Sequence, residues 1–162
     1  MLILGIDPGE KSSGVVLFDR RENRVLWSRE MSVEKLECDL RLGWSQKPDA
    51  IVCENIVPMG VPFSSNLRAT CRHIDRLEYI AEISRIPWAF ITRNQVKVAL
   101  CGRCKGVKDA NVSCAVQERF GGRKAARGTK KEPGPLYGVS GHCWQALAAL
   151  LARLEIGIEV NE

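Results

Sequence analysis

Two apolar segments joined by five residues occupy the first nineteen positions, and this short connection constrains the fold more than any other feature. Leu2–Asp7 is an apolar run that ends in the turn signal Asp-Pro-Gly, and residues 13–19 form a second strand candidate. A third candidate, residues 24–30, follows after another short turn. Because parallel neighbours need a much longer connection, the chain is predicted to begin with an antiparallel three-stranded meander.

The remaining chain alternates between helical and extended patterns. Apolar spacing and turn signals predict five helices and two more strands: helices at Val33–Leu42, from about Leu67 to Ile86, and near 94–101, 108–120 and 141–154, and strands at 50–53 and Trp88–Thr92. Residues 121–138, rich in Gly, Pro and basic side chains, are expected to form a mobile basic loop (about 121–139). This order predicts an α/β fold, a mixed five-stranded sheet with helices on both faces, in a single domain over residues 1–162.

Composition excludes several classes of protein. With 162 residues, 45% hydrophobic and 27% charged, the chain can bury a core, which argues against general disorder. The longest apolar run, residues 146–152, is far shorter than the ~20 residues of a membrane span. The first residues lack the pattern of a secretory signal, and seven scattered cysteines indicate reduced thiols. We therefore expect a cytoplasmic protein without a membrane partner.

Positive charge is concentrated in one part of the chain. Residues 93–131 hold eleven Lys or Arg and two acids, a net charge of +9, within a chain whose formal net charge is +5. Such polarisation indicates a polyanionic partner such as nucleic acid. Charge alone is equally compatible with a solvated basic face.

Two predicted strands end in a carboxylate, Asp7 after the first and Glu54 after the fourth. Chain direction places these strand ends side by side, where a divalent cation would relieve the repulsion between the two buried charges. Oxygen ligands favour Mg²⁺ or Mn²⁺ over zinc, and such a centre suits phosphoryl transfer. The pattern favours a metal site; the alternative is that Asp7 caps a turn and Glu54 forms a surface ion pair.

The last helix offers two further polar candidates. His142 and Gln145 are three residues apart and share one helix face. A neutral imidazole can bind a metal or orient water, although spacing alone favours the interpretation of His142 as an ordinary residue at a helix N-terminus.

Two other patterns are weaker. Cys101 and Cys104 are spaced like half of a zinc site, for which Cys71 and His73 could supply the other half, but the spacing between the pieces favours structural thiols. The motif GxxxxGK[ST] is absent, which excludes a P-loop nucleotide enzyme. No nucleotide cofactor is expected.

Five segments occur in an order that is typical of one family: ILGIDPGEKSSGVVLFD, AIVCENIV, TRNQVKVALCG, KGVKDANVSCAVQERF and GHCWQALAALLA. Together they resemble RuvC-type Holliday junction resolvases of the RNase H-like superfamily, particularly the divergent short members found in bacteriophages. The resemblance implies an RNase H-like fold and a homodimeric endonuclease with two Mg²⁺ or Mn²⁺ ions per site. It also implies paired nicks in opposing strands of a four-way DNA junction, in a bacterial or phage-infected cell.

The resemblance also assigns roles to particular residues. Asp7, Glu54 and His142 would be metal ligands, and Lys97 in the Gln-Val-Lys run would contact phosphate near the cut. In the loop after Glu54, which contains Met59, Phe63 would be the aromatic wedge at the junction crossover. The helix over 67–86 would form much of the dimer interface. The residues expected to contact DNA are Phe63, Arg93, Lys105, Lys108, Arg123, Lys124, Arg127, Lys130 and Lys131.

Two positions depart from the family pattern. Gln145 stands where the family has an Asp; its carbonyl can bind a metal, but it is neutral and cannot act as a base. Asp109 stands where the family has a second basic residue, for which Lys108 or Lys105 could substitute. Two alternatives to a junction resolvase therefore stay open: a related RNase H-like nuclease acting on branched DNA or RNA–DNA hybrid, and a catalytically silent protein that binds junctions.

Overall fold

Five strands form one mixed sheet in the computed structural model, which describes residues 1–43, 46–57 and 64–157. The strand order is β3-β2-β1-β4-β5, with β1–β2 and β2–β3 antiparallel and β1–β4 and β4–β5 parallel. The predicted meander and the predicted mixed sheet are therefore confirmed. The strands are β1 Leu2–Asp7, β2 Ser12–Asp19, β3 Arg24–Ser32, β4 Ala50–Asn55 and β5 Trp88–Thr92.

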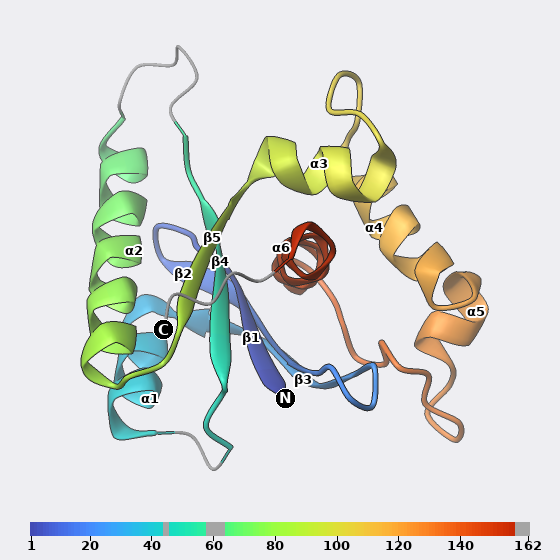
Figure 1. The fold of residues 1–162 in the computed structure, drawn as a ribbon, viewed down its shortest axis with the longest axis horizontal. Helices are drawn as coiled ribbons and strands as arrows, with labels where there is room; N and C mark the ends of the chain where they lie inside the picture. Colours follow the sequence, from blue (N-terminus) through green and yellow to red (C-terminus); the bar gives the residue numbers. More distant parts are fainter. Residues whose placement is uncertain (44–45, 58–63, 158–162) are drawn as a thin grey trace.

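Helices cover both faces of this sheet (Figure 1). Alternate residues of β1 point to opposite faces: Leu4 and Ile6 pack with α1 and α2, whereas Ile3 packs with the helices of the other face. The molecule thus has three layers and two hydrophobic cores, one on each side of the sheet. The helices are α1 Val33–Leu42, α2 Ser65–Ile83, α3 Arg93–Cys101, α4 Asp109–Arg119, α5 Gly122–Arg127 and α6 Cys143–Ile156.

The last helix, α6, lies directly on the strands because two glycines let it approach. A Cβ atom on Gly5 would lie 2.6 Å from the carbonyl oxygen of Ala146, and one on Gly14 would lie 2.5 Å from the carbonyl carbon of His142. The backbone of α6 therefore packs against β1 and β2 at a distance that no larger residue permits. This contact fixes the position of His142 relative to the end of β1.

Local caps fix where two helices begin. Ser64 accepts a hydrogen bond from the Leu67 backbone N–H at 3.2 Å and starts α2, as its residue type predicts. Thr92 and Gln95 form a reciprocal capping box at the start of α3. Because Thr92 also ends β5, the chain passes from strand to helix without a loop, and Arg93 stands at the junction.

The segment expected to be a loop over 121–138 is partly helical, so that expectation is wrong for α5. Ala126 and Leu136 within it are fully buried, and the Leu136 backbone N–H donates to the Ala126 carbonyl at 2.8 Å. The Gly and Pro residues suggested a loop. Composition alone does not reveal that Ala126 and Leu136 pack onto the core. Several boundaries also differ from the prediction: β3 runs to Ser32, β4 continues to Asn55, and α2 begins at Ser65 and ends at Ile83.

No helix within the described ranges is long and apolar enough to cross a membrane. All seven cysteines lie in those ranges, and none forms a disulfide.

Candidate active site

Two carboxylates lie next to each other at one edge of the sheet. Ile6 of β1 is opposite Cys53 of β4 in a parallel pairing, so the residues that follow, Asp7 and Glu54, are neighbours in register. Their side chains are only 19% and 13% exposed. The predicted juxtaposition of the two strand ends is confirmed.

The environment of these carboxylates disfavours their charged forms. Burial raises the pKa of Asp7, against the opposing effects of His142 and Arg93. Burial also raises the pKa of Glu54 to about 7, with Arg93 opposing the shift and Asp7 adding to it. The positive charge nearby does not fully compensate the two acids, so this edge of the sheet favours an added cation.

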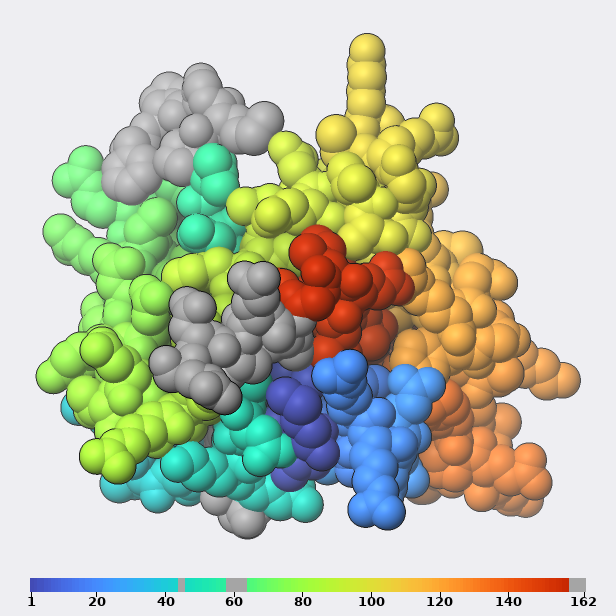
Figure 2. Space-filling model, in the orientation of Figure 1, coloured from blue at the N-terminus to red at the C-terminus, as the bar shows by residue number. Residues whose placement is uncertain are grey.

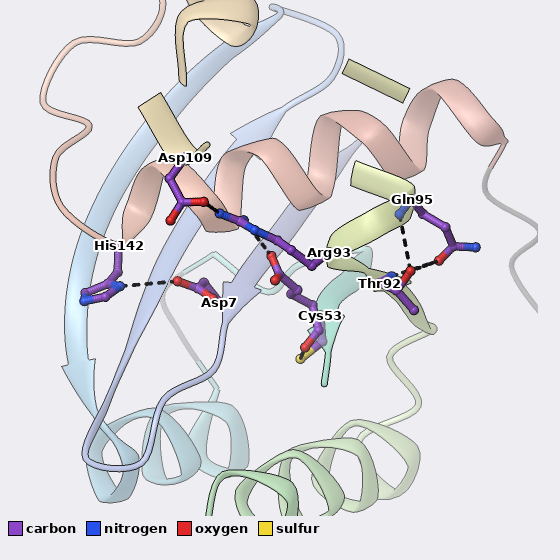
Figure 3. Close-up of polar contacts among 8 residues, drawn as sticks. Asp7, Cys53, Thr92, Arg93, Gln95, Asp109 and His142 are labelled. Atoms are coloured by element: carbon purple, nitrogen blue, oxygen red, sulfur yellow. Dashed lines mark hydrogen bonds and ion pairs between the residues drawn. The ribbon is translucent and has the colours of Figure 1, made fainter. Parts of the chain in front are cut away.

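Arg93 connects Glu54 to a third acid, Asp109. One terminal nitrogen of the guanidinium donates to Glu54 Oε2 at 3.1 Å, and the other contacts Asp109 Oδ1 at the start of α4 (Figure 3). Sequence analysis placed Arg93 among the DNA contacts and did not foresee either ion pair. No spacing rule links residues 93 and 109, because their contact depends on how α3 and α4 pack.

His142 reaches the same edge from the N-terminus of α6. Its Nδ1 lies 3.5 Å from Asp7 Oδ2, and its ring is 69% exposed (Figure 3). The backbone N–H of His142 donates to Glu30 Oε1 at 3.1 Å. Sequence reasoning missed Glu30, which stands on β3 and ties the start of α6 to the sheet.

Two other predicted site residues lie on the same helices without a contact to the acids. Gln145 follows His142 by three residues, and its Oε1 is buried with no hydrogen-bond partner among the described residues. Such an unpaired buried oxygen is an available ligand. Lys97 lies one turn along α3 from Arg93 and is partly buried; its phosphate contact stays a prediction.

The chemistry of these groups fits a divalent cation, although the side chains are not gathered around one point. In the parts of the chain that the structure describes, no three His, Cys, Asp or Glu side chains are placed to hold an ion. Glu54 turns to Arg93, whereas Asp7 turns to His142. The two carboxylates, the imidazole and the unpaired Gln145 oxygen are suitable Mg²⁺ or Mn²⁺ ligands.

The raised pKa of Glu54 predicts a pH-dependent effect of Glu54→Gln on stability. The folded pKa is about 7, whereas the ordinary pKa of a Glu is 4.5. The protonated carboxyl therefore stabilises the folded protein at low pH, and this stabilisation is lost as pH rises from about 4.5 to 7. The Gln variant does not undergo this loss. In EDTA, its free energy of unfolding relative to that of wild type is therefore about 2 kcal/mol higher at pH 8 than at pH 5. Urea unfolding measures the difference. An equal effect of Glu54→Gln on stability at both pH values would contradict the raised pKa of Glu54. Glu22→Gln, at an exposed position, is the control.

The predicted DNA contacts fall mainly on exposed parts of the α3–α5 side, which Figure 2 shows in yellow to orange as one continuous surface. Arg127 differs, because it is half-buried and its guanidinium carbon lies 5.0 Å from the centre of the Trp144 ring. It therefore packs α5 onto α6. Phe63 and Met59 lie outside the described residues. The exposed members are Lys105, Lys108, Arg123, Lys124, Lys130 and Lys131.

The two halves of the possible zinc site are not brought together. Cys71 and His73 stand on α2, whereas Cys101 ends α3 on the other side of the sheet (Figure 1). His73 is buried and instead bonds the Ser13 hydroxyl and the Glu37 carboxylate, each at 3.2 Å. The His73 ring is therefore occupied by Ser13 and Glu37 and does not complete a site with Cys101.

Comparison with known proteins gives a match in structure and none in sequence. No protein-family model matches the chain, and the search of curated proteins finds no match. The RuvC structure of Thermus thermophilus matches with a TM-score of 0.69 and 19% identity, covering 95% of this chain and 93% of that one. T. thermophilus RuvC in complex with a Holliday junction substrate matches with a TM-score of 0.69 and 19% identity, over 96% and 94% of the two chains. The chain therefore has the RuvC fold over nearly its whole length, as its motifs predicted.

Proposed function

We propose that the protein is a structure-selective endonuclease that resolves four-way DNA junctions by divalent-metal-dependent phosphodiester hydrolysis. The observation that carries this proposal is the pair of buried carboxylates, Asp7 and Glu54, on neighbouring strands of a RuvC fold. The similar T. thermophilus protein has been captured with a Holliday junction substrate. The fold neighbour supports the proposed substrate class, and the paired acids support the proposed reaction chemistry.

Each group at the sheet edge has a part in this reaction. Asp7 and Glu54, with the His142 imidazole and the Gln145 carbonyl, would hold the metal, expected as two ions. Bound Mg²⁺ or Mn²⁺ supplies activation of water and stabilisation of the leaving oxygen. Glu30 holds the α6 N-terminus through the His142 backbone N–H, which keeps the imidazole beside Asp7. The protein contributes the geometry that makes the metal effective.

The basic α3–α5 side would hold the DNA. Its lysines and arginines contact phosphates, which orients a nucleic acid without reading its sequence. A homodimer would present two sites to one junction, consistent with paired nicks. The exposed apolar side chains Tyr79 and Ile83 on α2, 59% and 57% exposed, support α2 as the dimer interface.

A substrate panel tests the proposal. A labelled synthetic four-way junction, the matching linear duplex and an RNA–DNA hybrid are incubated with the protein in Mg²⁺ or Mn²⁺. We expect symmetric nicks in opposing strands of the junction and none in the duplex. Preferential cutting of the hybrid would instead identify a related RNase H-like nuclease.

The neutral Gln145 favours one second candidate, a protein that binds junctions without cutting them. If the protein is a nuclease that lacks one charged ligand, Gln145→Asp raises cleavage at limiting Mg²⁺ by about tenfold, a typical effect of a metal-site substitution. Gln145→Leu, which removes the oxygen, lowers cleavage. Initial rates on the labelled junction measure both changes. Tight binding by wild type, with cleavage only in Gln145→Asp, would establish the silent binder.

A further inference from the structure

The guanidinium of Arg93 is held at two points between acids from different elements. One nitrogen donates to Glu54 Oε2 on β4 at 3.1 Å, and the other contacts the carboxylate of Asp109 on α4 (Figure 3). The side chain of Arg93 is 25% exposed and that of Glu54 is 13% exposed, whereas Asp109 is 66% exposed. The guanidinium of Arg93 is therefore held in a fixed position beside Glu54 and Asp109.

Two contacts leave much of the guanidinium's capacity unused. The group has five N–H donors in a rigid plane, and it matches a phosphate in shape and charge. A quarter of the Arg93 side chain is exposed to solvent. A phosphate that approaches Glu54 from solvent would meet these donors.

A cation is needed at this place because the edge is otherwise strongly acidic. Asp7, Glu54 and Asp109 act on one another there, and a DNA phosphate adds another negative charge. Asp109 stands where the family pattern has a basic residue. The acid that stands there holds Arg93 instead, so the positive charge reaches the site from α3 and not from α4.

We propose that Arg93 is a catalytic residue that binds the scissile phosphate, and that Asp109 is the residue that positions it. This inference rests on the proposed nuclease function. A guanidinium anchored by two carboxylates is already oriented, so it stabilises developing charge on the phosphate without reorganisation. Asp109 touches no reacting atom and acts only through Arg93.

The first test separates turnover from binding. Arg93→Gln lowers kcat for junction cleavage by about 100-fold, as expected for the loss of one charge-stabilising donor. Junction affinity in EDTA changes by less than about threefold, because many other phosphate contacts remain. Asp109→Asn lowers kcat by about tenfold, less than the loss of the guanidinium itself. Arg41→Gln, on α1 across the sheet, is the matched control and leaves both quantities unchanged.

The second test moves the charge to the other residue. In the double variant Arg93→Gln with Asp109→Lys, the cation reaches the same place from α4. We expect it to recover at least about tenfold of the kcat lost in Arg93→Gln, because an electrostatic role requires the charge and not a particular residue. Thermal unfolding of each variant shows whether the fold is intact.

The outcomes are distinct. If wild type cleaves junctions and Arg93→Gln stays within about threefold of its kcat, a small fraction of a donor's usual effect, the catalytic role is overturned while the nuclease function stands. A large loss with no recovery in the folded double variant would assign Arg93 a structural role. If wild type cuts no branched DNA, the proposed function fails, and the role of Arg93 fails with it.

Discussion

Asp7→Asn abolishes junction cleavage, lowering the rate by at least about 1,000-fold, because a metal's Lewis-acid contribution is several kcal/mol and each 1.4 kcal/mol is tenfold. The amide keeps the shape of the carboxyl group but lacks the charge that attracts the cation. Folding is expected to survive, since burial raises the pKa of Asp7 and the charge itself is unfavourable in the metal-free protein. Single-turnover cleavage of the labelled junction measures the loss.

Two controls distinguish a loss of catalysis in Asp7→Asn from a loss of DNA binding or of folding. Junction affinity in EDTA stays near that of wild type, because the basic side of the protein is unchanged. Glu22→Gln, which removes an acid from an exposed turn, leaves cleavage intact. Cleavage by Asp7→Asn at the wild-type rate would remove Asp7 from the reaction.

Gly14→Ala lowers cleavage by about 100-fold, the cost of a misplacement of about 1 Å in a catalytic site. A Cβ at this position would lie 2.5 Å from the His142 carbonyl carbon and 2.9 Å from the Cys143 backbone nitrogen. These are backbone atoms, so no side-chain rotation relieves the clash, and the start of α6 must move. That movement separates His142 from Asp7, 3.5 Å away in the wild-type protein. Junction cleavage well below the unfolding temperature measures the effect.

Gly5→Ala is the matched comparison for this variant. Its Cβ would meet the Ala146 carbonyl oxygen at 2.6 Å, one turn further along α6. Both substitutions overpack the same helix contact and are expected to cost about 1–3 kcal/mol of stability. Only Gly14→Ala moves His142 directly, so its cleavage falls further. Equal cleavage by the two variants would argue against a role for the position of His142.

Much of the fold follows from local patterns that tertiary contacts do not override. The short turns around β2 permit only antiparallel neighbours, and helix α1 covers the predicted range, Val33–Leu42. The pairing of Asp7 with Glu54 was predictable because the direction of a parallel strand decides which ends meet. α5 was missed because the glycines around it suggested a loop, although its Arg, Lys and Ala residues favour a helix. Burial of Ala126 stabilises that helix.

The finer structure of the site depends on distances that no sequence pattern contains. Asp109 meets Arg93 only because α3 and α4 pack at one end of the sheet, and Glu30 supports His142 across more than a hundred residues. The need for glycine at position 14 follows from the approach of α6, which is a property of the packed molecule. The sequence predicted Asp7 and Glu54. It did not predict that Asp109 holds Arg93 or that Glu30 supports His142.

The most direct test of junction resolution uses a supercoiled plasmid that extrudes a cruciform, incubated with the wild-type protein in Mg²⁺ and in EDTA. Two nicks on opposing strands at the base of the cruciform convert the plasmid to a linear product. We expect linear product in Mg²⁺, none in EDTA, and none from a plasmid without the cruciform. Accumulation of nicked circles alone, or a linear product that forms equally in EDTA, would contradict metal-dependent paired resolution.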